Sequence, residues 1–141
     1  AKGGCVEIQS GQLTEAAQGF GEVQLAAEPI DSSDLFLYHK TTNRRAYERA
    51  LASRPGASDV LMFNERHELT ESTIANFVFE IDGARFTPPV RCGLLPGTAR
   101  ASLLEQGQVK ERVMHVDELT RASRLWLVNS VRGMHEISPP R

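Results

Sequence analysis

Lys40 is the residue of this chain best suited to covalent chemistry. It follows a run of apolar and aromatic residues, Leu35 to His39, over which we predict a short strand. Such a strand would carry the ammonium group of Lys40 into the interior, where burial lowers the pKa of a lysine. A neutral amine is the form that makes a Schiff base with a carbonyl group. The alternative is that the amine of Lys40 reaches solvent along its flexible stem.

A pyridoxal-phosphate site requires an amine, which Lys40 can supply, a carboxylate for the ring nitrogen and a cradle for the phosphate. Glu71 can supply the carboxylate. It lies in the polar corner Thr70–Thr73 between two predicted strands, where a side chain can point into a cleft. A carboxylate that faces the pyridine nitrogen keeps this nitrogen protonated, so that the ring accepts electrons. The other interpretation of the same residues is an ordinary exposed corner.

The third requirement is a cradle for a phosphate group. The segment Leu95–Thr98 leads into a predicted helix, whose N-terminal N–H groups and macrodipole favour an anion. Asn129 and Ser130 end a predicted buried strand and can add donors. Taken alone, Gly97 also fits a simple turn, and Ser130 also fits an ordinary polar strand end.

The predicted elements that must position these groups alternate between strands and short helices. The pair Asp82-Gly83 signals a two-residue hairpin. Together the elements predict an α/β (mixed α+β) fold built on a mixed sheet. Strands are expected over Cys5–Gln9, Glu22–Ala27, Leu35–His39, Asp59–Phe63, Ala75–Ile81, Ala84–Thr87, Val109–Val116, Leu125–Asn129 and Met134–Ile137, and helices over Thr41–Ser53, Thr98–Gln106 and, capped by Asp117, Glu118–Ala122.

The composition narrows the function classes. The 141 residues, 40% of them hydrophobic, fit one domain or a large subdomain. A net charge of −2 with both signs interspersed indicates neither nucleic acid nor an acidic membrane as partner. We expect no metal site, because the four histidines lack zinc-like spacing. Cys5 and Cys92 are expected to be free thiols in a reducing, cytoplasmic compartment, since no signal peptide or membrane-spanning run is visible.

Four segments resemble the class IV aminotransferase (fold type IV) family. Among its members, the chain most resembles 4-amino-4-deoxychorismate lyases, particularly those fused behind an aminodeoxychorismate synthase component. The segments are Tyr38–Arg44 around the lysine, Leu69–Phe77 with its Thr-Glu and Asn-Phe pairs, Gly93–Arg100 with Leu-Pro-Gly, and Val128–Gly133 near the end.

The resemblance implies a role for each candidate residue and the large-domain fold of D-amino-acid aminotransferases. Lys40 would be the Schiff-base lysine and proton shuttle, and Glu71 would pair with the pyridine nitrogen of pyridoxal 5′-phosphate. Apart from the resemblance, Arg44 could bind a substrate carboxylate if it points inward, and otherwise lies on a solvated helix face. The other implied cofactor contacts are Leu95 against the ring face, Gly97 in the phosphate loop, the backbone amides of Thr98 and Ala99 on the phosphate, and Asn129 and Ser130 near the phosphate or the substrate.

The resemblance also implies a domain division. Residues 31–141 would be the large cofactor-binding domain, and residues 1–30 the tail of a small N-terminal domain with its linker. In the family the small domain closes over the cofactor and supplies an arginine to the phosphate. The implied partners are a small-molecule substrate, the missing small domain or fused synthase component, and a second copy of the chain in a homodimer.

The expected reaction converts 4-amino-4-deoxychorismate to 4-aminobenzoate and pyruvate, a step of folate biosynthesis. One alternative keeps the cofactor and makes the chain a branched-chain or D-amino-acid aminotransferase, because the same lysine and glutamate serve transamination. A second alternative is an inactive fragment that acts as a structural or dimerisation module.

Overall fold

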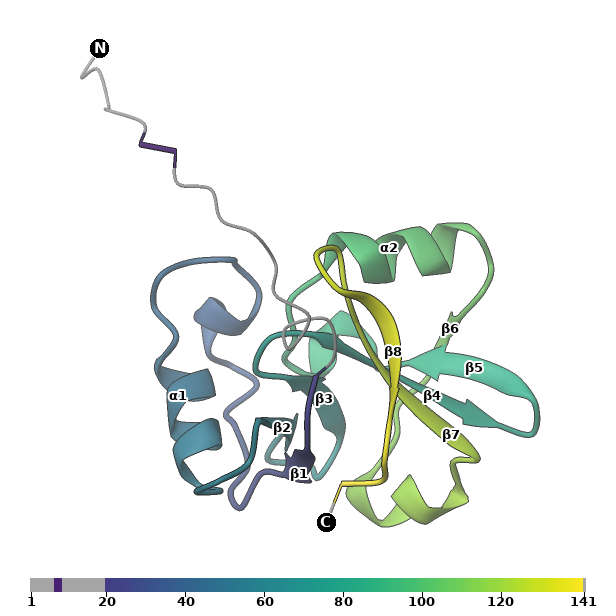
Figure 1. Cartoon of the computed structure of the whole chain (residues 1–141), viewed down its shortest axis with the longest axis horizontal. Helices are drawn as coiled ribbons and strands as arrows, with labels where there is room; N and C mark the ends of the chain where they lie inside the picture. Colours follow the sequence, from purple (N-terminus) through teal and green to yellow (C-terminus); the bar gives the residue numbers. More distant parts are fainter. Residues whose placement is uncertain (1–6, 9–19, 141) are drawn as a thin grey trace.

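A mixed sheet of eight strands is the framework of this protein in a computed structural model, which describes residues 7–8 and 20–140 (Figure 1). Strand β1 runs parallel to β2 and β5 parallel to β6, while the other pairs are antiparallel. This arrangement confirms the predicted mixed α/β class. The strands are β1 (Val23–Leu25), β2 (Asp59–Phe63), β3 (Leu69–Ser72), β4 (Asn76–Ile81), β5 (Ala84–Thr87), β6 (Lys110–Glu111), β7 (Arg124–Asn129) and β8 (Gly133–Ile137), and the helices are α1 (Arg45–Ala52), α2 (Thr98–Glu105) and the 3-10 turns η2 (Leu35–Leu37), η3 (Val90–Cys92) and η4 (Val116–Arg121).

Strand β4 is the centre of the sheet. Along one edge it pairs with β7 from Asn76 to Glu80. The other edge is shared, because β3 pairs only at Glu71↔Asn76 and β5 pairs from Phe79 onward. The first residue of β4 is therefore the point at which three strands meet, and Glu71 lies beside it.

Both faces of β4 are buried. Phe77 and Phe79 are fully buried in the main core, on one face of the strand. Val78 points to the opposite face, as the alternation of side chains along a strand requires, and packs with Trp126 and Val128 of β7. Helix α2 covers this second face through Ala99, Leu103 and Leu104. Val78 thus anchors α2 together with the β7 residues, and with α2 the loop that leads into it. Figure 1 shows α2 against the sheet.

The predicted hairpin between β4 and β5 is confirmed. Asp82 and Gly83 both have positive φ, of 52° and 75°, as a two-residue turn of the primed type requires. The strands on either side pair at Ile81↔Ala84. Aspartate tolerates the left-handed region better than most residues, and glycine adopts it without strain.

The predicted strand Leu35–His39 is wrong. Residues Leu35–Leu37 form the 3-10 turn η2, because Asp34 Oδ1 accepts a hydrogen bond from the N–H of Phe36 at 2.9 Å and caps the turn. Only Leu37 is fully buried, whereas Leu35 is 71% and Phe36 46% exposed. The apolar run Leu35–His39 has the composition of a strand, but none of the described strands pairs with it.

Two predictions near the end of the chain are also corrected. The strand expected over Val109–Val116 is reduced to β6, because its partner β5 is followed by Pro88-Pro89 and proline has no N–H for a ladder. The helix expected over Glu118–Ala122 is the 3-10 turn η4, which begins earlier. It does so because Glu118 Oε2 accepts a hydrogen bond from the N–H of His115 at 3.1 Å.

The predicted strands Asp59–Phe63 and Ala84–Thr87 occur with the predicted ends, and the remaining predicted elements within the described residues have shifted ends. Helix α1 is shorter than the predicted Thr41–Ser53, and the predicted strand Cys5–Gln9 lies outside the described residues, apart from positions 7 and 8.

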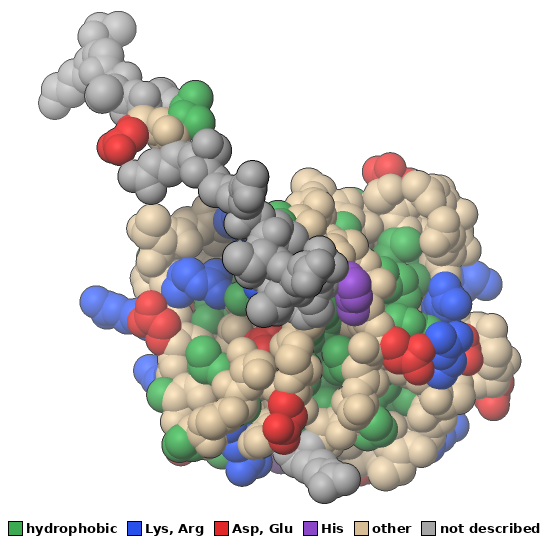
Figure 2. Space-filling model, viewed as in Figure 1, with side chains coloured by type: hydrophobic (Ala, Val, Ile, Leu, Met, Phe, Trp, Pro, Cys, Tyr) green, Lys and Arg blue, Asp and Glu red, His purple; other side chains and the backbone are tan. Residues whose placement is uncertain are grey.

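Cys92 is a buried free thiol, whereas Cys5 is not described. On the face shown in Figure 2, acidic and basic side chains are intermixed. Among the described residues, no helix has the length and apolar character needed to cross a membrane.

Gly83→Ala tests the backbone origin of the hairpin. A Cβ at Gly83 would meet no atom within 4 Å, so the substitution changes only the conformational preference of the backbone. We expect a loss of about 1 kcal/mol in the free energy of unfolding, measured by urea denaturation. Gly83→Asn is the control and should lose less, because asparagine tolerates positive φ. Equal losses for the two variants would contradict this explanation.

Candidate active site

A cleft of about 690 Å³ gathers every candidate residue named from the sequence. Its walls come from the segment before α1, from the end of β3 with the bend that follows, from the loop before α2, and from the end of β7. The segments lie far apart in sequence and meet because β4 holds β3 and β7 on its two edges. The candidate residues on the cleft are Lys40, Arg44, Glu71, Leu95, Gly97, Thr98, Ala99, Asn129 and Ser130.

Lys40 lies at the exposed rim of the cleft rather than in an interior. It follows η2 and precedes α1, in a stretch without regular structure. The expected burial was wrong because the expected strand is absent. Of the lysines that the structure describes, Lys40 borders the cleft and Lys110 lies on β6. Lys40 therefore remains the candidate for an amine that reacts in the cleft.

Glu71 is the buried carboxylate of the cleft, with 4% of its surface exposed. It lies on β3 itself rather than in a corner between strands. Its Oε1 accepts hydrogen bonds from the hydroxyl of Tyr47 and from the N–H of Leu95, each at 2.9 Å. Its Oε2 accepts one from Nδ2 of Asn76, also at 2.9 Å. Three donors from three separate segments thus hold one carboxylate.

Burial raises the pKa of Glu71 to about 8, because a desolvated carboxylate is less stable in its charged form. The hydrogen bonds from Leu95 and Tyr47 and the positive charges of Arg44 and Arg100 oppose this rise without cancelling it. A cation placed beside Glu71 would favour the ionised form. A protonated pyridine nitrogen is a group of this kind.

Arg44 and Tyr47 form a stack beside Glu71. The guanidinium carbon of Arg44 lies 4.4 Å from the centre of the Tyr47 ring, and Nη2 of Arg44 donates a hydrogen bond to the carbonyl of Thr73. Burial and the adjacent Glu71 carboxylate raise the pKa of the Tyr47 hydroxyl, so it stays a hydrogen-bond donor. Arg44 is half-buried at the cleft wall and already holds the bend after β3.

Asn76 connects Glu71 to the loop before α2. Its Nδ2 donates to Oε2 of Glu71 and to the carbonyl of Leu95, each at 2.9 Å. A Cβ added to Gly97 would lie 2.2 Å from Oδ1 of Asn76, so this position has room for glycine alone. The φ of Gly97 is −66°, and the constraint is therefore space rather than backbone strain.

The N-terminus of α2 opens onto the same cleft. Thr98 and Ala99 begin the helix, so their N–H groups have no acceptor within it and can bind an anion. Thr98 is exposed and its hydroxyl is accessible from solvent. The residues present thus offer donors for a phosphate at one end of the cleft and a carboxylate for a cationic nitrogen within it.

Asn129 and Ser130 close the remaining wall at the end of β7. Nδ2 of Asn129 donates to the carbonyl of Ile74 at 3.1 Å, and its Oδ1 accepts from the N–H groups of Val131 and Arg132. The Asn129 side chain therefore holds the bend after β3 and the turn after β7. Ser130 is exposed on the cleft.

Sequence reasoning missed Tyr47 and Asn76 as residues of the site. Tyr47 falls within the predicted helix Thr41–Ser53, and an aromatic residue carrying a hydroxyl is a candidate partner for any buried acid. Asn76 belongs to the Asn-Phe pair of the resemblance. An asparagine that begins an otherwise apolar strand, Asn76–Ile81, is the signal that could have identified it.

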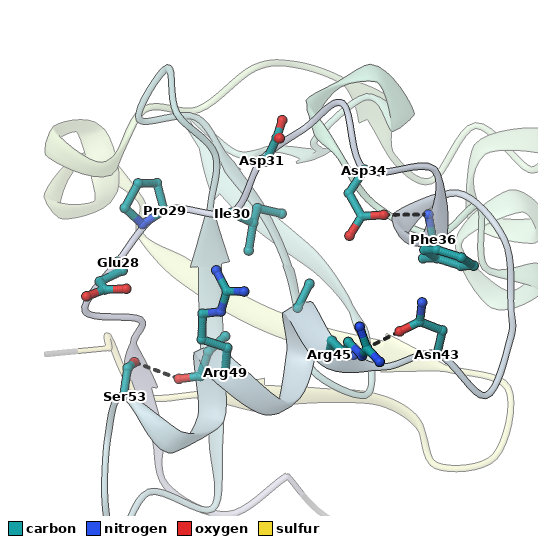
Figure 3. Close-up of a pocket in the computed structure, with 12 residues that line it drawn as sticks. Glu28, Pro29, Ile30, Asp31, Asp34, Phe36, Asn43, Arg45, Arg49 and Ser53 are labelled. Atoms are coloured by element: carbon teal, nitrogen blue, oxygen red, sulfur yellow. Dashed lines mark hydrogen bonds between the residues drawn. The ribbon is translucent and has the colours of Figure 1, made fainter.

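A second cavity, of about 550 Å³, lies on another side of α1 and is lined by none of the candidate residues (Figure 3). Asn43 and Arg45, the neighbours of Arg44 in sequence, line it. Its polar groups serve the local structure. Asp34 caps η2, and the hydroxyl of Ser53 donates to the carbonyl of Ala50 at 2.6 Å. Arg45 and Arg49 are exposed to solvent. Among the described residues, the candidate amine, the buried acid and the phosphate donors therefore lie together on the cleft around Glu71 and not on this second cavity.

Comparisons with known proteins show the family of this chain. Residues 8–138 match the family model of class IV amino-transferases, and the chain belongs to this family. A Schizosaccharomyces pombe protein provisionally named an aminodeoxychorismate lyase is 38% identical over 101 residues, which are 67% of this chain and 44% of that protein.

Two solved structures have the same fold. A provisionally named amino-acid aminotransferase from Mesorhizobium loti has a TM-score of 0.77 and 39% identity over 82% of this chain and 57% of that chain. The 4-amino-4-deoxychorismate lyase from Pseudomonas aeruginosa has a TM-score of 0.71 and 25% identity over 83% of this chain and 46% of that chain. The chain thus spans about half the length of these relatives.

Class IV aminotransferases and aminodeoxychorismate lyases depend on pyridoxal phosphate. The cleft fits this group by its own geometry. The buried carboxylate of Glu71 has a raised pKa, and a cation beside it would favour its charged form. The N-terminus of α2 offers N–H donors for a phosphate. At Gly97, next to this N-terminus, Asn76 leaves no room for a side chain. The resemblance found in the sequence is therefore confirmed at the level of family and cofactor.

The raised pKa of Glu71 predicts how the stability of the cofactor-free chain depends on pH. The folded chain holds its proton up to about pH 8, whereas the unfolded chain releases it near the ordinary value of 4.5. The free energy of unfolding should therefore fall as pH rises between these values, by at most about 1.4 kcal/mol per pH unit. Glu71→Gln should remove this component, measured by urea denaturation from pH 5 to 8. Identical pH profiles for the two proteins would contradict the burial of an ionisable Glu71.

A double-mutant cycle tests the contact between Asn76 and Gly97. Gly97→Ala should lower the free energy of unfolding by about 1–3 kcal/mol, because the added methyl group overlaps the Asn76 side chain. In an Asn76→Ala background the same change should cost little, since the obstructing amide is gone. Equal costs in the two backgrounds would show that Gly97 is required for another reason.

Proposed function

We propose that this chain is the cofactor-binding domain of a pyridoxal-phosphate-dependent lyase, which converts 4-amino-4-deoxychorismate to 4-aminobenzoate and pyruvate. The observation that carries the proposal is the meeting of Lys40, Glu71 and the N-terminus of α2 on one cleft. These residues supply an amine, a buried acid and a phosphate cradle. The lyase relatives among the comparisons support the reaction.

Each residue has a defined task in this proposal. Pyridoxal phosphate, when bound, supplies the electron sink. The amine of Lys40 would hold the cofactor and would also be the base that removes the ring proton next to the amino group of the substrate. Glu71 would keep the proton on the ring nitrogen, and the N–H groups of Thr98 and Ala99 would hold the phosphate. Leu95 would pack against the ring face.

The chemistry of the substrate reduces what the protein must do. Loss of pyruvate makes the ring of the substrate aromatic, which supplies much of the driving force. The protein therefore has mainly to orient the C–H bond towards Lys40 and to exclude water. Asn129 and Ser130 border the cleft on the side of β7, where they would lie near the phosphate or the substrate.

Transamination of a branched-chain or D-amino acid is the second candidate reaction. The 39% identity to the Mesorhizobium loti aminotransferase supports it, because the same lysine and glutamate can serve both reactions. Arg44 would then contribute to binding the substrate carboxylate with the N–H groups that it does not use on Thr73.

We further propose that residues 31–141 form the cofactor-binding domain, since they carry every residue of the cleft named above. Residues 1–30 would be the end of a small domain and its linker, although β1 within this range pairs with β2 and so belongs to the sheet of the cofactor-binding domain. The small domain or a fused synthase component, and a second copy of the chain, would complete the active enzyme in the cytoplasm. If they are required, the isolated chain is an inactive structural or dimerisation module.

Trapping the cofactor on Lys40 tests the site directly. We expect pyridoxal phosphate and borohydride to give one covalent adduct, located on Lys40 by peptide mass spectrometry and absent from Lys40→Ala. Lys110→Ala is the matched control and should leave the adduct unchanged, because Lys110 lies on β6. An adduct that persists in Lys40→Ala would refute the assigned anchor.

The two reactions differ in their need for a second substrate. A lyase should release pyruvate from 4-amino-4-deoxychorismate without any keto acid, measured by coupled reduction of pyruvate. Lys40→Ala should abolish this release, because it removes both the anchor and the proton carrier. Amino-group exchange with 2-oxoglutarate in place of pyruvate release would favour the aminotransferase.

A further inference from the structure

The hydrogen bonds on Glu71 are distributed unequally between its two oxygens. Oε1 accepts from Tyr47 and from the N–H of Leu95, whereas Oε2 accepts from Asn76 alone. A carboxylate oxygen has two lone-pair positions. Oε1 is therefore fully used, and Oε2 keeps one position open.

Tyr47 is held rigidly in place. Its side chain is 7% exposed, and the guanidinium of Arg44 lies over one side of the ring. Arg44 is itself bound to the carbonyl of Thr73, so the bend after β3 holds the guanidinium over the Tyr47 ring. Tyr47 also belongs to the helix that follows the Lys40 segment. Its hydroxyl thus connects the helix next to the amine with the carboxylate.

We propose that Tyr47 is a positioning residue, which occupies Oε1 of Glu71 so that Oε2 alone is offered to the ring nitrogen of the cofactor. This inference rests on the proposed function, and it adds a residue that neither the motifs nor the comparisons assign. Without the hydroxyl, Oε1 regains an open position and the carboxylate can offer either oxygen. The ring nitrogen then loses its fixed relation to Lys40.

The proposal gives Tyr47 a measurable effect on the acidity of Glu71. The Tyr47 hydroxyl lowers the pKa of Glu71, and so do the charges of Arg44 from the start of α1 and Arg100 from α2. His39 and Lys40 border the same cleft. Removing the hydroxyl while keeping the ring leaves all these charges in place, so that any change in the titration of Glu71 reports on the hydrogen bond.

The test compares Tyr47→Phe with Tyr38→Phe. Both variants lose one phenol hydroxyl, but the hydroxyl of Tyr38 donates to the carbonyl of Ser32 at 2.6 Å rather than to Glu71. In the cofactor-free chain, the pH range over which stability falls should extend to higher pH in Tyr47→Phe, measured by urea denaturation. Tyr38→Phe should keep the range of the parent chain.

A second measurement uses the full chain with pyridoxal phosphate. The dissociation constant of the cofactor should rise about tenfold in Tyr47→Phe, equivalent to the loss of one hydrogen bond to a charged group. The pH at which the visible absorption of the bound cofactor changes should also move. Tyr38→Phe should leave both quantities unchanged, because its hydroxyl does not contact Glu71. Added salt should not restore the affinity of Tyr47→Phe, because the lost contact is a buried hydrogen bond.

The outcomes separate the two proposals. If the parent chain binds the cofactor on Lys40 and Tyr47→Phe matches it in both pH profile and affinity, the role of Tyr47 is overturned. Equal changes in Tyr38→Phe would overturn it as well, since the effect would then come from any lost hydroxyl. Failure of the parent chain to bind pyridoxal phosphate would instead overturn the proposed function, and with it the role of Tyr47 towards the cofactor.

Discussion

The burial of one carboxylate, that of Glu71, is the constraint on which the site depends. A charged or polar group taken out of water is stable only when its hydrogen bonds are satisfied. The three donors come from α1, from the first residue of β4 and from the loop before α2. Each of these segments must therefore be placed to within the tolerance of a hydrogen bond, and the walls of the cleft follow from that requirement.

The bend after β3 shows how the surroundings support this arrangement. Asp59 on β2 accepts hydrogen bonds from the N–H and the hydroxyl of Thr73, at 3.0 and 2.5 Å. Arg44 binds the carbonyl of Thr73, and Asn129 binds that of Ile74. The bend is thus held from β2, α1 and β7 at once. Because β3 and β4 pair only at Glu71↔Asn76, these side chains replace the ladder that a longer hairpin would supply.

The sequence predicted those features that depend on local chemistry. The hairpin at Asp82-Gly83, the strand Asp59–Phe63 and the helix after Gly97 were all recognised, because turn residues and apolar runs mark them. Four motifs also placed Lys40, Glu71 and the loop before α2 in one site before any geometry was known.

The features that local sequence patterns do not predict depend on tertiary contacts. The run Leu35–His39 has the composition of a strand, yet no neighbour is available and the Asp34 cap decides the local structure. The roles of Tyr47 and Asn76 are not predicted, because they arise from the approach of α1 and β4 to Glu71. The exposed position of Lys40 likewise follows from the path of the chain between η2 and α1.

The spread of the three donors along the chain also bears on how the protein folds. Tyr47 and Leu95 each lie 24 residues from Glu71, on opposite sides of it in sequence. Contacts between distant segments form only after their loops have closed, so they tend to appear late. The cleft is consequently a product of nearly complete folding. Affinity for the cofactor would then report on whether a preparation of this chain has reached its native state, and the bound cofactor would favour that state by mass action.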